Sequence, residues 1–201
     1  FIPNGVDNKV TRASDSIKAR WGLDKGSYLL YLGRLVPEKR PELLIEAFKK
    51  LETNKRLVIA GGGSDTSEFE KTLHVLAEGD MRILFTGFVS EEPLEELYSN
   101  AYAYVLPSDV EGMPMSLLEA MAHGRCCVTS DVPDCADVLA GAGLTFKQGD
   151  AADLRRVLRD ALADSAMASR LGIAARERVN TTYDWDSVVK RTLALYEGEV
   201  R

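Results

Sequence analysis

Short apolar runs alternate with helical segments along most of the chain, and this alternation is the feature that most restricts its fold. The run Tyr28–Leu32 is continuous, apolar and ended by a glycine, which is typical of a strand buried on both faces of a parallel sheet. Residues 41–51 follow with apolar side chains at helical spacing behind a proline. Further predicted strands lie at 56–60, 82–86, 101–106, 125–129 and 143–146, and further predicted helices at 67–77, 92–99, 115–122 and 133–139.

Strands that alternate with helices predict a parallel sheet with right-handed crossovers and helices on both faces. The predicted fold class is therefore α/β, a Rossmann-like doubly wound parallel sheet of about six strands. Extra C-terminal helices are predicted at 151–162, 166–179 and 185–199. We expect residues 1–26 to form a linker segment, 27–183 the Rossmann-like domain and 184–201 a last helix. The opening, FIPNGVD, has no initiator methionine and resembles the end of a strand before a turn, so we expect a piece of a longer chain.

The charge balance and the cysteines argue against several classes of protein. A net charge of −6 over 201 residues disfavours a nucleic-acid partner held by phosphate neutralisation. A net negative charge still allows a local cationic pocket for a small phosphate-bearing ligand. The cysteines, Cys126, Cys127 and Cys135, show neither paired spacing nor a histidine cluster, which disfavours zinc or disulfides and indicates a reducing compartment. No apolar stretch approaches the roughly 20 residues that span a bilayer, and no signal peptide is recognisable. We expect a cytoplasmic protein.

The loops that follow the predicted strands are where a ligand is expected, because open parallel sheets bind ligands at the carboxyl ends of their strands. These loops cover 33–39, 61–64, 86–89 and 107–115. In the first loop, Arg34 offers a planar fork and Lys39 a point charge, and together they suit the oxygens of a diphosphate. The alternative is that both cations are solvated, with Lys39 or Arg40 paired to Glu38 or Glu42.

The stretch 107–124 carries two acids, Glu111 in a turn and Glu119 inside a predicted helix, with seven residues between them. Ser116 and Glu119 also match a capping box, in which Glu119 would only bind a backbone amide. Pro114 instead fits as the first helical residue, which would free Glu119 to point outward. In that interpretation the two acids converge on one ligand, and the helix start between them favours an anionic group.

Other motifs have simpler structural explanations. The loop 61–64, GGGS, invites a dinucleotide interpretation, but the third glycine of that fingerprint would fall on Thr66. We interpret the loop as a tight turn whose amides have a modest chance of approaching a ligand. The triplet 184–186, DWD, has the spacing of a metal-binding motif, but at a helix start its first acid serves as an N-cap and its tryptophan anchors the last helix. His74 and His123 lack a second ligand at i+3 or i+4, and His123 fits the end of its helix, so no metal site is expected.

Five motifs occur in one order along the chain and together resemble a known family. They are IPNGVD at 2–7, YLGRLVPEK at 31–39, LVIAGGG at 57–63, FTGFV at 85–89 and PSDVEGMPMSLLEAMAHG at 107–124. The sequence resembles the carboxyl-terminal, donor-binding half of the GT-B fold glycosyltransferases of family GT4, the glycosyl transferases group 1. The resemblance covers nearly the whole chain, and the two acids separated by seven residues are its most specific part.

The resemblance implies a role for each matched residue. Arg34 and Lys39, beside Gly33, correspond to the pair that holds the donor diphosphate in place of a metal. Glu119 corresponds to the acid that binds the ribose hydroxyls, and Glu111, the implied catalytic residue, to the acid near the donor sugar. The remaining implied substrate-binding residues are Phe88 and Val89, along the base, and Gly112, Met113, Pro114 and Met115, whose backbone meets the sugar and the phosphate. The sequence reads Gly-Met-Pro at 112–114, where many relatives have Gly-Phe-Gly.

We therefore expect the donor-binding half of a retaining, metal-independent glycosyltransferase of the hexosyltransferase type. The enzyme would move a sugar from a UDP- or GDP-sugar to an acceptor in glycan, glycolipid or polysaccharide synthesis, without a cofactor. Its expected partners are the nucleotide-sugar donor and a missing N-terminal acceptor-binding domain. That domain would mediate any peripheral association with a membrane. No nucleic-acid partner is expected. Without that domain the chain is expected to be inactive. The sequence leaves open the donor sugar, the base, the acceptor, and whether Glu111 acts as a nucleophile or through its charge.

Two other classes of protein stay open at this point. A non-catalytic nucleotide-binding or regulatory domain would share the same loops. A dinucleotide-dependent oxidoreductase would need a glycine fingerprint and a ribose-binding acid, which the loop 61–64 does not supply.

Overall fold

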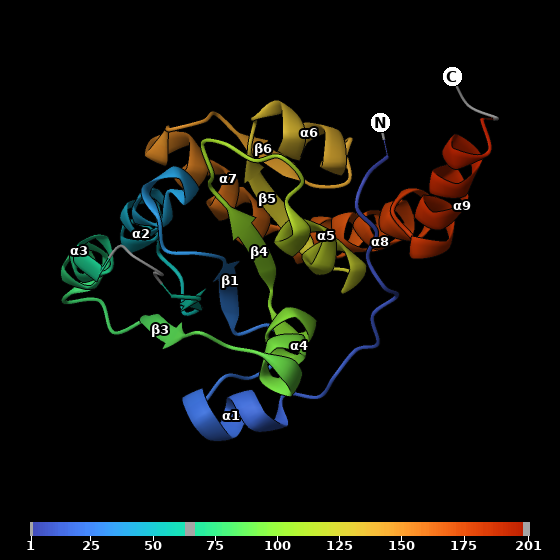
Figure 1. The fold of residues 1–201 in the computed structure, drawn as a ribbon. Coiled ribbons are helices and arrows are strands. Elements are labelled where there is room, and N and C mark those ends of the chain that lie inside the picture. Colours follow the sequence, from blue (N-terminus) through green and yellow to red (C-terminus); the bar gives the residue numbers. More distant parts are fainter. Residues whose placement is uncertain (1, 63–66, 199–201) are drawn as a thin grey trace.

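The computed structural model describes residues 2–62 and 67–198, whose strands form one parallel sheet between two layers of helices (Figure 1). The six strands lie in the order β3-β2-β1-β4-β5-β6. Their bounds are β1 Tyr28–Leu32, β2 Arg56–Ala60, β3 Ile83–Gly87, β4 Ala103–Leu106, β5 Cys126–Ser130 and β6 Leu144–Phe146. The predicted α/β class and Rossmann-like doubly wound sheet are thus confirmed.

The helices cover both faces of the sheet because side chains of each strand point alternately to either side. In β1, Tyr28 and Leu30 pack on the side of α1, α4, α5, α6 and most of α8, whereas Leu29 and Tyr31 pack on the side of α2, α3 and α7. The helices are α1 Asp15–Trp21, α2 Pro41–Lys49, α3 Ser67–Ala77, α4 Glu91–Asn100, α5 Met115–Ala122, α6 Pro133–Leu139, α7 Ala151–Ala163, α8 Ser165–Thr182 and α9 Trp185–Tyr196, with a short 3-10 helix, η1, at Pro37–Lys39. None of the helices in the described part of the chain is long and apolar enough to cross a membrane.

The strand order reverses between β1 and β4, which are hydrogen-bonded neighbours although two strands separate them in the sequence. Their register pairs Leu29 with Ala103 and Leu30 with Tyr104. From β1 the chain moves outward to β2 and β3, then returns and moves the other way through β5 and β6. In a sheet of this order the crevice above the carboxyl ends of the two central strands is the usual ligand site.

The first helix is held to the domain by a buried carboxylate from α4. Glu96 is 3% exposed and accepts hydrogen bonds from the backbone N–H groups of Ser16 at 3.2 Å and Ile17 at 2.9 Å. Burial acts to raise the pKa of Glu96, but these hydrogen bonds outweigh it and hold the pKa below its usual value. Glu96 therefore satisfies amides at the start of α1 that the helix itself leaves unpaired.

The N-terminal segment lies beside the start of the last helix. Val6 forms a parallel bridge with Asp184, and the Trp185 ring covers Gly5 so closely that a Cβ there would lie 2.5 Å from it. Asp184 accepts from the N–H of Ser187 at 2.9 Å, which confirms the predicted N-cap of the DWD triplet. Figure 1 shows α9 projecting beyond the sheet and its covering helices.

Candidate functional site

The loops after β1 and β4 are tied together at the reversal of strand order. The backbone N–H of Asp109 donates to the Glu38 carbonyl oxygen at 2.9 Å. Below them, the buried Tyr104 hydroxyl hydrogen-bonds to the Leu32 carbonyl at 3.2 Å and to the Ser116 hydroxyl at 2.7 Å. Tyr104 thus joins the end of β1 to the start of α5, and the relative position of the two loops is fixed.

Arg34 has a backbone held by a hydrogen bond and a solvent-exposed side chain. The hydroxyl of Tyr31, a fully buried residue, donates to the Arg34 carbonyl oxygen at 2.8 Å, and burial raises the pKa of this tyrosine so that it keeps its proton. The Arg34 side chain is 64% exposed, and its guanidinium lies 3.7 Å from the Glu38 carboxylate, a loose contact. The backbone of Arg34 is therefore fixed, and its guanidinium is accessible to an anionic ligand.

Lys39 and Glu111 form an ion pair across the same crevice. Lys39 Nζ lies 2.7 Å from Glu111 Oε1, and the side chains are 19% and 7% exposed. The alternative that Lys39 pairs with Glu38 or Glu42 is wrong, because its partner is Glu111 on the other loop. The same alternative is confirmed for Arg40, whose Nε lies 2.9 Å from the Glu42 carboxylate.

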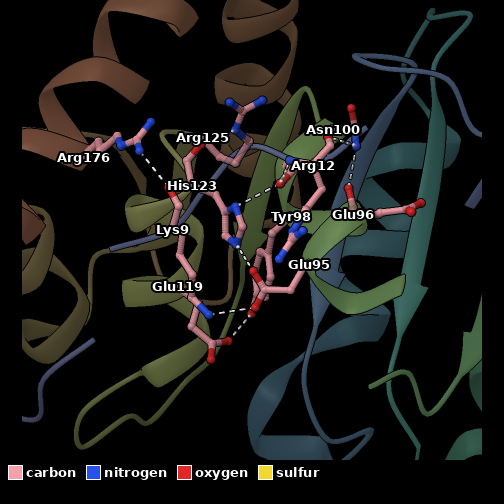
Figure 2. Close-up of polar contacts among 11 residues, drawn as sticks. Lys9, Arg12, Glu95, Glu96, Tyr98, Asn100, Glu119, His123, Arg125 and Arg176 are labelled. Carbon is pink, nitrogen blue, oxygen red and sulfur yellow. Dashed lines mark hydrogen bonds and ion pairs between the residues drawn. The ribbon is translucent and has the colours of Figure 1, made fainter. Parts of the chain in front are cut away.

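Glu119 is bound by a side chain and not by the backbone. The capping-box interpretation is wrong, because the Ser116 hydroxyl bonds to Tyr104 and α5 has no side-chain cap. The prediction that Pro114 is the first helical residue is also wrong: Pro114 occupies the N-cap, and α5 begins one residue later. Figure 2 shows that Glu119 Oε2 instead accepts a hydrogen bond from the Tyr98 hydroxyl, at 2.9 Å.

A pocket of about 200 Å³ opens beside Arg34, at the carboxyl ends of β1, β2 and β3. It is lined by Leu32, Gly33, Arg34, Ala60, Gly61, Gly62, Phe88 and Val89. It brings together four of the predicted residues, Gly33, Arg34, Phe88 and Val89, and adds Gly61 and Gly62 from the loop that we interpreted mainly as a turn. Phe88 is 84% exposed, so its ring is a surface on which a planar group can lie. The rest of that loop, 63–66, lies outside the described residues.

The loop between β4 and α5 presents its backbone more than its side chains. Pro114 is buried and Met113 packs against the core, while Gly112 and Met115 are exposed. Since the first N–H groups of a helix have no partner within it, this loop can offer donors to an anion.

The comparison with known families decides the class of this protein. The family model described as "Glycosyl transferases group 1" matches residues 14–178. The chain belongs to this family. The resemblance seen in the five motifs is thereby confirmed.

Relatives of this glycosyl transferases group 1 chain match nearly its whole length, but the chain covers only about half of each of them. Mannosylfructose-phosphate synthase from Agrobacterium fabrum is 29% identical over 222 residues, which cover 98% of this chain and 47% of that protein. Sucrose-phosphate synthase from Thermosynechococcus elongatus superposes with a TM-score of 0.84 at 29% identity, covering 98% of this chain and 51% of the other. Anabaena Alr3699/HepE in complex with UDP-glucose has a TM-score of 0.89 at 18% identity, covering 98% and 57%, and shows the fold alone. The chain spans about half the length of the curated relatives it matches.

A larger pocket of this group 1 chain, of about 330 Å³, lies at the opposite edge of the sheet. Its lining includes Lys25, Tyr102 and Arg125, which precede β1, β4 and β5. The Arg125 guanidinium donates to the backbone carbonyl oxygens of His123 and Ala101, so its charge serves the fold. Ligands of open parallel sheets bind at the other edge, and we therefore place the site there.

The tyrosines of the site are the residues that our reasoning from the sequence missed. Tyr31, Tyr98 and Tyr104 are buried, yet each hydroxyl reaches a loop or an acid of the site. A hydroxyl inside an otherwise aliphatic strand was the available signal for Tyr31 and Tyr104, because a buried tyrosine usually finds a hydrogen-bond partner.

Both histidines lie against other side chains of the fold. Within residues 2–62 and 67–198 there is no group of three or more His, Cys, Asp or Glu side chains placed to hold a metal ion. His74 lies against the ring of Phe85, with centroids 4.1 Å apart. His123 ends α5 as predicted and is buried, with Nδ1 3.1 Å from the Ser99 hydroxyl oxygen.

His123 is expected to make stability depend on pH. Burial lowers its pKa from 6.5 to about 4, although the charge of Glu95 acts to raise it. On acidification the unfolded chain gains this proton near pH 6.5 and the folded chain only near pH 4, so the free energy of unfolding should fall across that window. One such group contributes at most about 1.4 kcal/mol per pH unit.

Urea unfolding at several pH values should show that the free energy of unfolding depends less steeply on pH in His123→Gln than in the wild type. The exposed control His74→Gln should keep the wild-type slope. Equal slopes in all three proteins would contradict this.

Proposed function

We propose that this chain is the donor-binding half of a retaining, metal-independent glycosyltransferase that uses a UDP- or GDP-sugar. Its acceptor would belong to glycan, glycolipid or polysaccharide synthesis, and the acceptor-binding domain would lie outside the chain. The observation that carries the proposal is the Lys39–Glu111 ion pair, at 2.7 Å, above the reversal of strand order. It places a cation and an acid from two loops where an open parallel sheet binds nucleotides.

The cations of the first loop suit the leaving diphosphate. When the bond between the sugar C1 and the β-phosphate oxygen breaks, its electron pair stays on the phosphate, and negative charge grows there. Arg34, whose side chain is exposed, and Lys39, whose side chain is largely buried, can stabilise that charge without a metal. The start of α5 adds the positive end of its dipole.

Glu111 is paired with Lys39, which partly neutralises the negative charge that Glu111 presents to the donor sugar. In a retaining transfer, the acceptor oxygen bonds to C1 on the face that the phosphate leaves, and the acceptor proton passes to the departing phosphate oxygen. Positive charge develops on C1 as the C–O bond breaks, and a carboxylate nearby stabilises it. We assign this electrostatic role to Glu111, because Lys39 Nζ already occupies one carboxylate oxygen at 2.7 Å.

The remaining residues suit the nucleoside. Phe88 and Val89 line the pocket at the ends of β1–β3, where the exposed ring can lie against a base. Glu119, on the other side of the strand reversal, has its Oε2 bound to Tyr98, and its Oε1 can accept hydrogen bonds from the ribose hydroxyls.

A nucleotide should raise the melting temperature of this chain, and Arg34→Ala should remove the effect. Saturation to about 100 times Kd adds about 2.7 kcal/mol to the free energy of unfolding, which for a chain of this size is a rise of several degrees. UDP, GDP and ADP are to be compared by thermal denaturation, with Mg²⁺ and with EDTA, and the shift should be the same in both.

The matched control is Arg159→Ala, on α7. The Arg159 side chain is 68% exposed and pairs with its neighbour Asp160, much as Arg34 is 64% exposed and near Glu38. The control should keep the full shift. No shift with any of the three nucleotides at millimolar concentration, or a shift that needs Mg²⁺, would argue against the proposed site.

A further inference from the structure

Tyr98 reaches the candidate ribose-binding acid from a different helix. It lies on α4, is 1% exposed, and its hydroxyl donates to Glu119 Oε2 across a distance of 2.9 Å (Figure 2). Burial raises the pKa of Tyr98 well above its usual value, so the hydroxyl keeps its proton and remains a donor. Glu119 itself is only partly buried, and with Oε2 held in this way Oε1 stays available to accept from a ligand.

The Tyr98 ring is held in place by a stack of buried aromatic groups. It lies parallel to the His123 ring, with centroids 5.4 Å apart and an interplanar angle of 11°. On another side it packs against Tyr104, with centroids 6.0 Å apart. Tyr104 is the residue that joins the two loops of the site, so the hydroxyl of Tyr98 is fixed relative to those loops.

His123 is in turn held by α4 and by the N-terminal segment. Its Nδ1 lies 3.1 Å from the Ser99 hydroxyl oxygen, and its Nε2 lies 3.2 Å from Glu95 Oε2. The other oxygen of Glu95 accepts from Lys9 Nζ at 2.7 Å. Figure 2 shows dashed lines that join Lys9 to Glu95 and Glu95 to the His123 ring, on which Tyr98 stacks. Three separate segments therefore support the one hydroxyl that reaches Glu119.

We propose that Tyr98 is a positioning residue of the donor site, which holds the Glu119 carboxylate in the orientation that accepts hydrogen bonds from the nucleotide ribose. This inference rests on the proposed function, in which Glu119 binds the ribose hydroxyls. A free glutamate side chain loses rotamer freedom when a ligand orders it, and a carboxylate already ordered by Tyr98 avoids that loss on binding. Tyr98 makes no contact with the ligand in this arrangement and acts only through Glu119.

The test compares ligands with and without ribose hydroxyls. UDP and GDP, each beside its 2′,3′-dideoxy counterpart, are titrated into the chain by calorimetry. Tyr98→Phe should weaken the binding of the ribose form about fivefold, roughly the effect of one hydrogen bond, and leave the dideoxy form unchanged. Because Tyr98 acts through Glu119, adding Tyr98→Phe to Glu119→Ala should cause no further loss.

A matched control separates positioning from stability. Tyr28 is a fully buried tyrosine whose hydroxyl donates to the Leu97 carbonyl oxygen of the same helix, at 2.7 Å. Tyr28→Phe thus removes one buried hydroxyl next to α4, and it should lower the melting temperature about as much as Tyr98→Phe without changing either affinity. Equal weakening of the ribose and dideoxy forms by Tyr98→Phe, or no weakening at all, would overturn the proposal for Tyr98 while the site stands. If Glu119→Ala also leaves ribose binding unchanged, the assignment of Glu119 in the proposed function fails, and the role of Tyr98 fails with it.

Discussion

Lys39→Ala is expected to weaken nucleoside-diphosphate binding about 10- to 100-fold and to destabilise the protein as well. The loss of affinity follows because a charge-assisted hydrogen bond contributes about 1.5–3 kcal/mol. The loss of stability follows from Glu111, whose side chain is 7% exposed and would be left without the ammonium that lies 2.7 Å away. An unpaired, nearly buried carboxylate costs about 1–3 kcal/mol.

The two effects of Lys39→Ala can be separated with a second substitution. In Lys39→Ala/Glu111→Gln the unpaired charge is gone, so the free energy of unfolding should return most of the way to that of the wild type. Nucleotide affinity should stay low, because the diphosphate still lacks its cation. Urea unfolding and calorimetry with UDP and GDP measure the two quantities on the same samples.

Arg34→Ala is the natural comparison for Lys39→Ala, because the Arg34 side chain is exposed and has only a loose acidic neighbour. Arg34→Ala should weaken nucleotide binding and leave the free energy of unfolding unchanged. If Lys39→Ala unfolds like the wild type, the ion pair contributes nothing to the fold. If it binds nucleotides like the wild type, Lys39 is not a ligand for the diphosphate.

The fold could be predicted from the sequence because its four central strands, β1, β2, β4 and β5, are buried on both faces. A run such as Tyr28–Leu32 needs no partner to be recognised, and the predicted strand has the bounds of β1. The predicted helix 115–122 likewise has the bounds of α5, but the interpretation that Pro114 is the first helical residue is wrong, because its ψ of 89° places it at the N-cap. A proline fits either position by its φ angle alone, so the sequence did not distinguish them.

The site was only partly predictable, because some of its contacts join residues that no spacing rule connects. Arg34, Lys39 and Glu111 stand in the loops after two strands and Glu119 stands within α5, all in stretches that motifs can mark. The partner of Glu119 is 21 positions away on α4, and the partner of Lys39 is on a loop from another strand. Such pairs follow from the strand order, which places β1 against β4, and not from local periodicity.

The glycines of the second loop show the same limit. From the sequence, 61–64 was mainly a tight turn, whereas in the fold Gly61 lies against the first loop of the site. Gly33 N donates to the Ala60 carbonyl at 3.1 Å, and Gly61 N donates to the Gly87 carbonyl at 2.9 Å. The ends of β1, β2 and β3 are therefore bound to one another by their backbones, and the 200 Å³ pocket lies among them.

Gly61→Ala is expected to lower the free energy of unfolding by about 2–4 kcal/mol, the range of backbone strain combined with a steric clash. Gly61 has a φ of 134°, which side chains rarely tolerate, and a Cβ there would clash with the Gly33 carbonyl oxygen. Because Gly33 lines the pocket, its displacement should also reduce nucleotide binding in the molecules that stay folded. The control is Gly62→Ala: Gly62 lines the same pocket, but no heavy atom lies within 4 Å of its Cβ position, and it should change stability little. Urea unfolding of both variants measures the difference, and equal stabilities would mean that the Gly33–Gly61 approach is not needed for the fold.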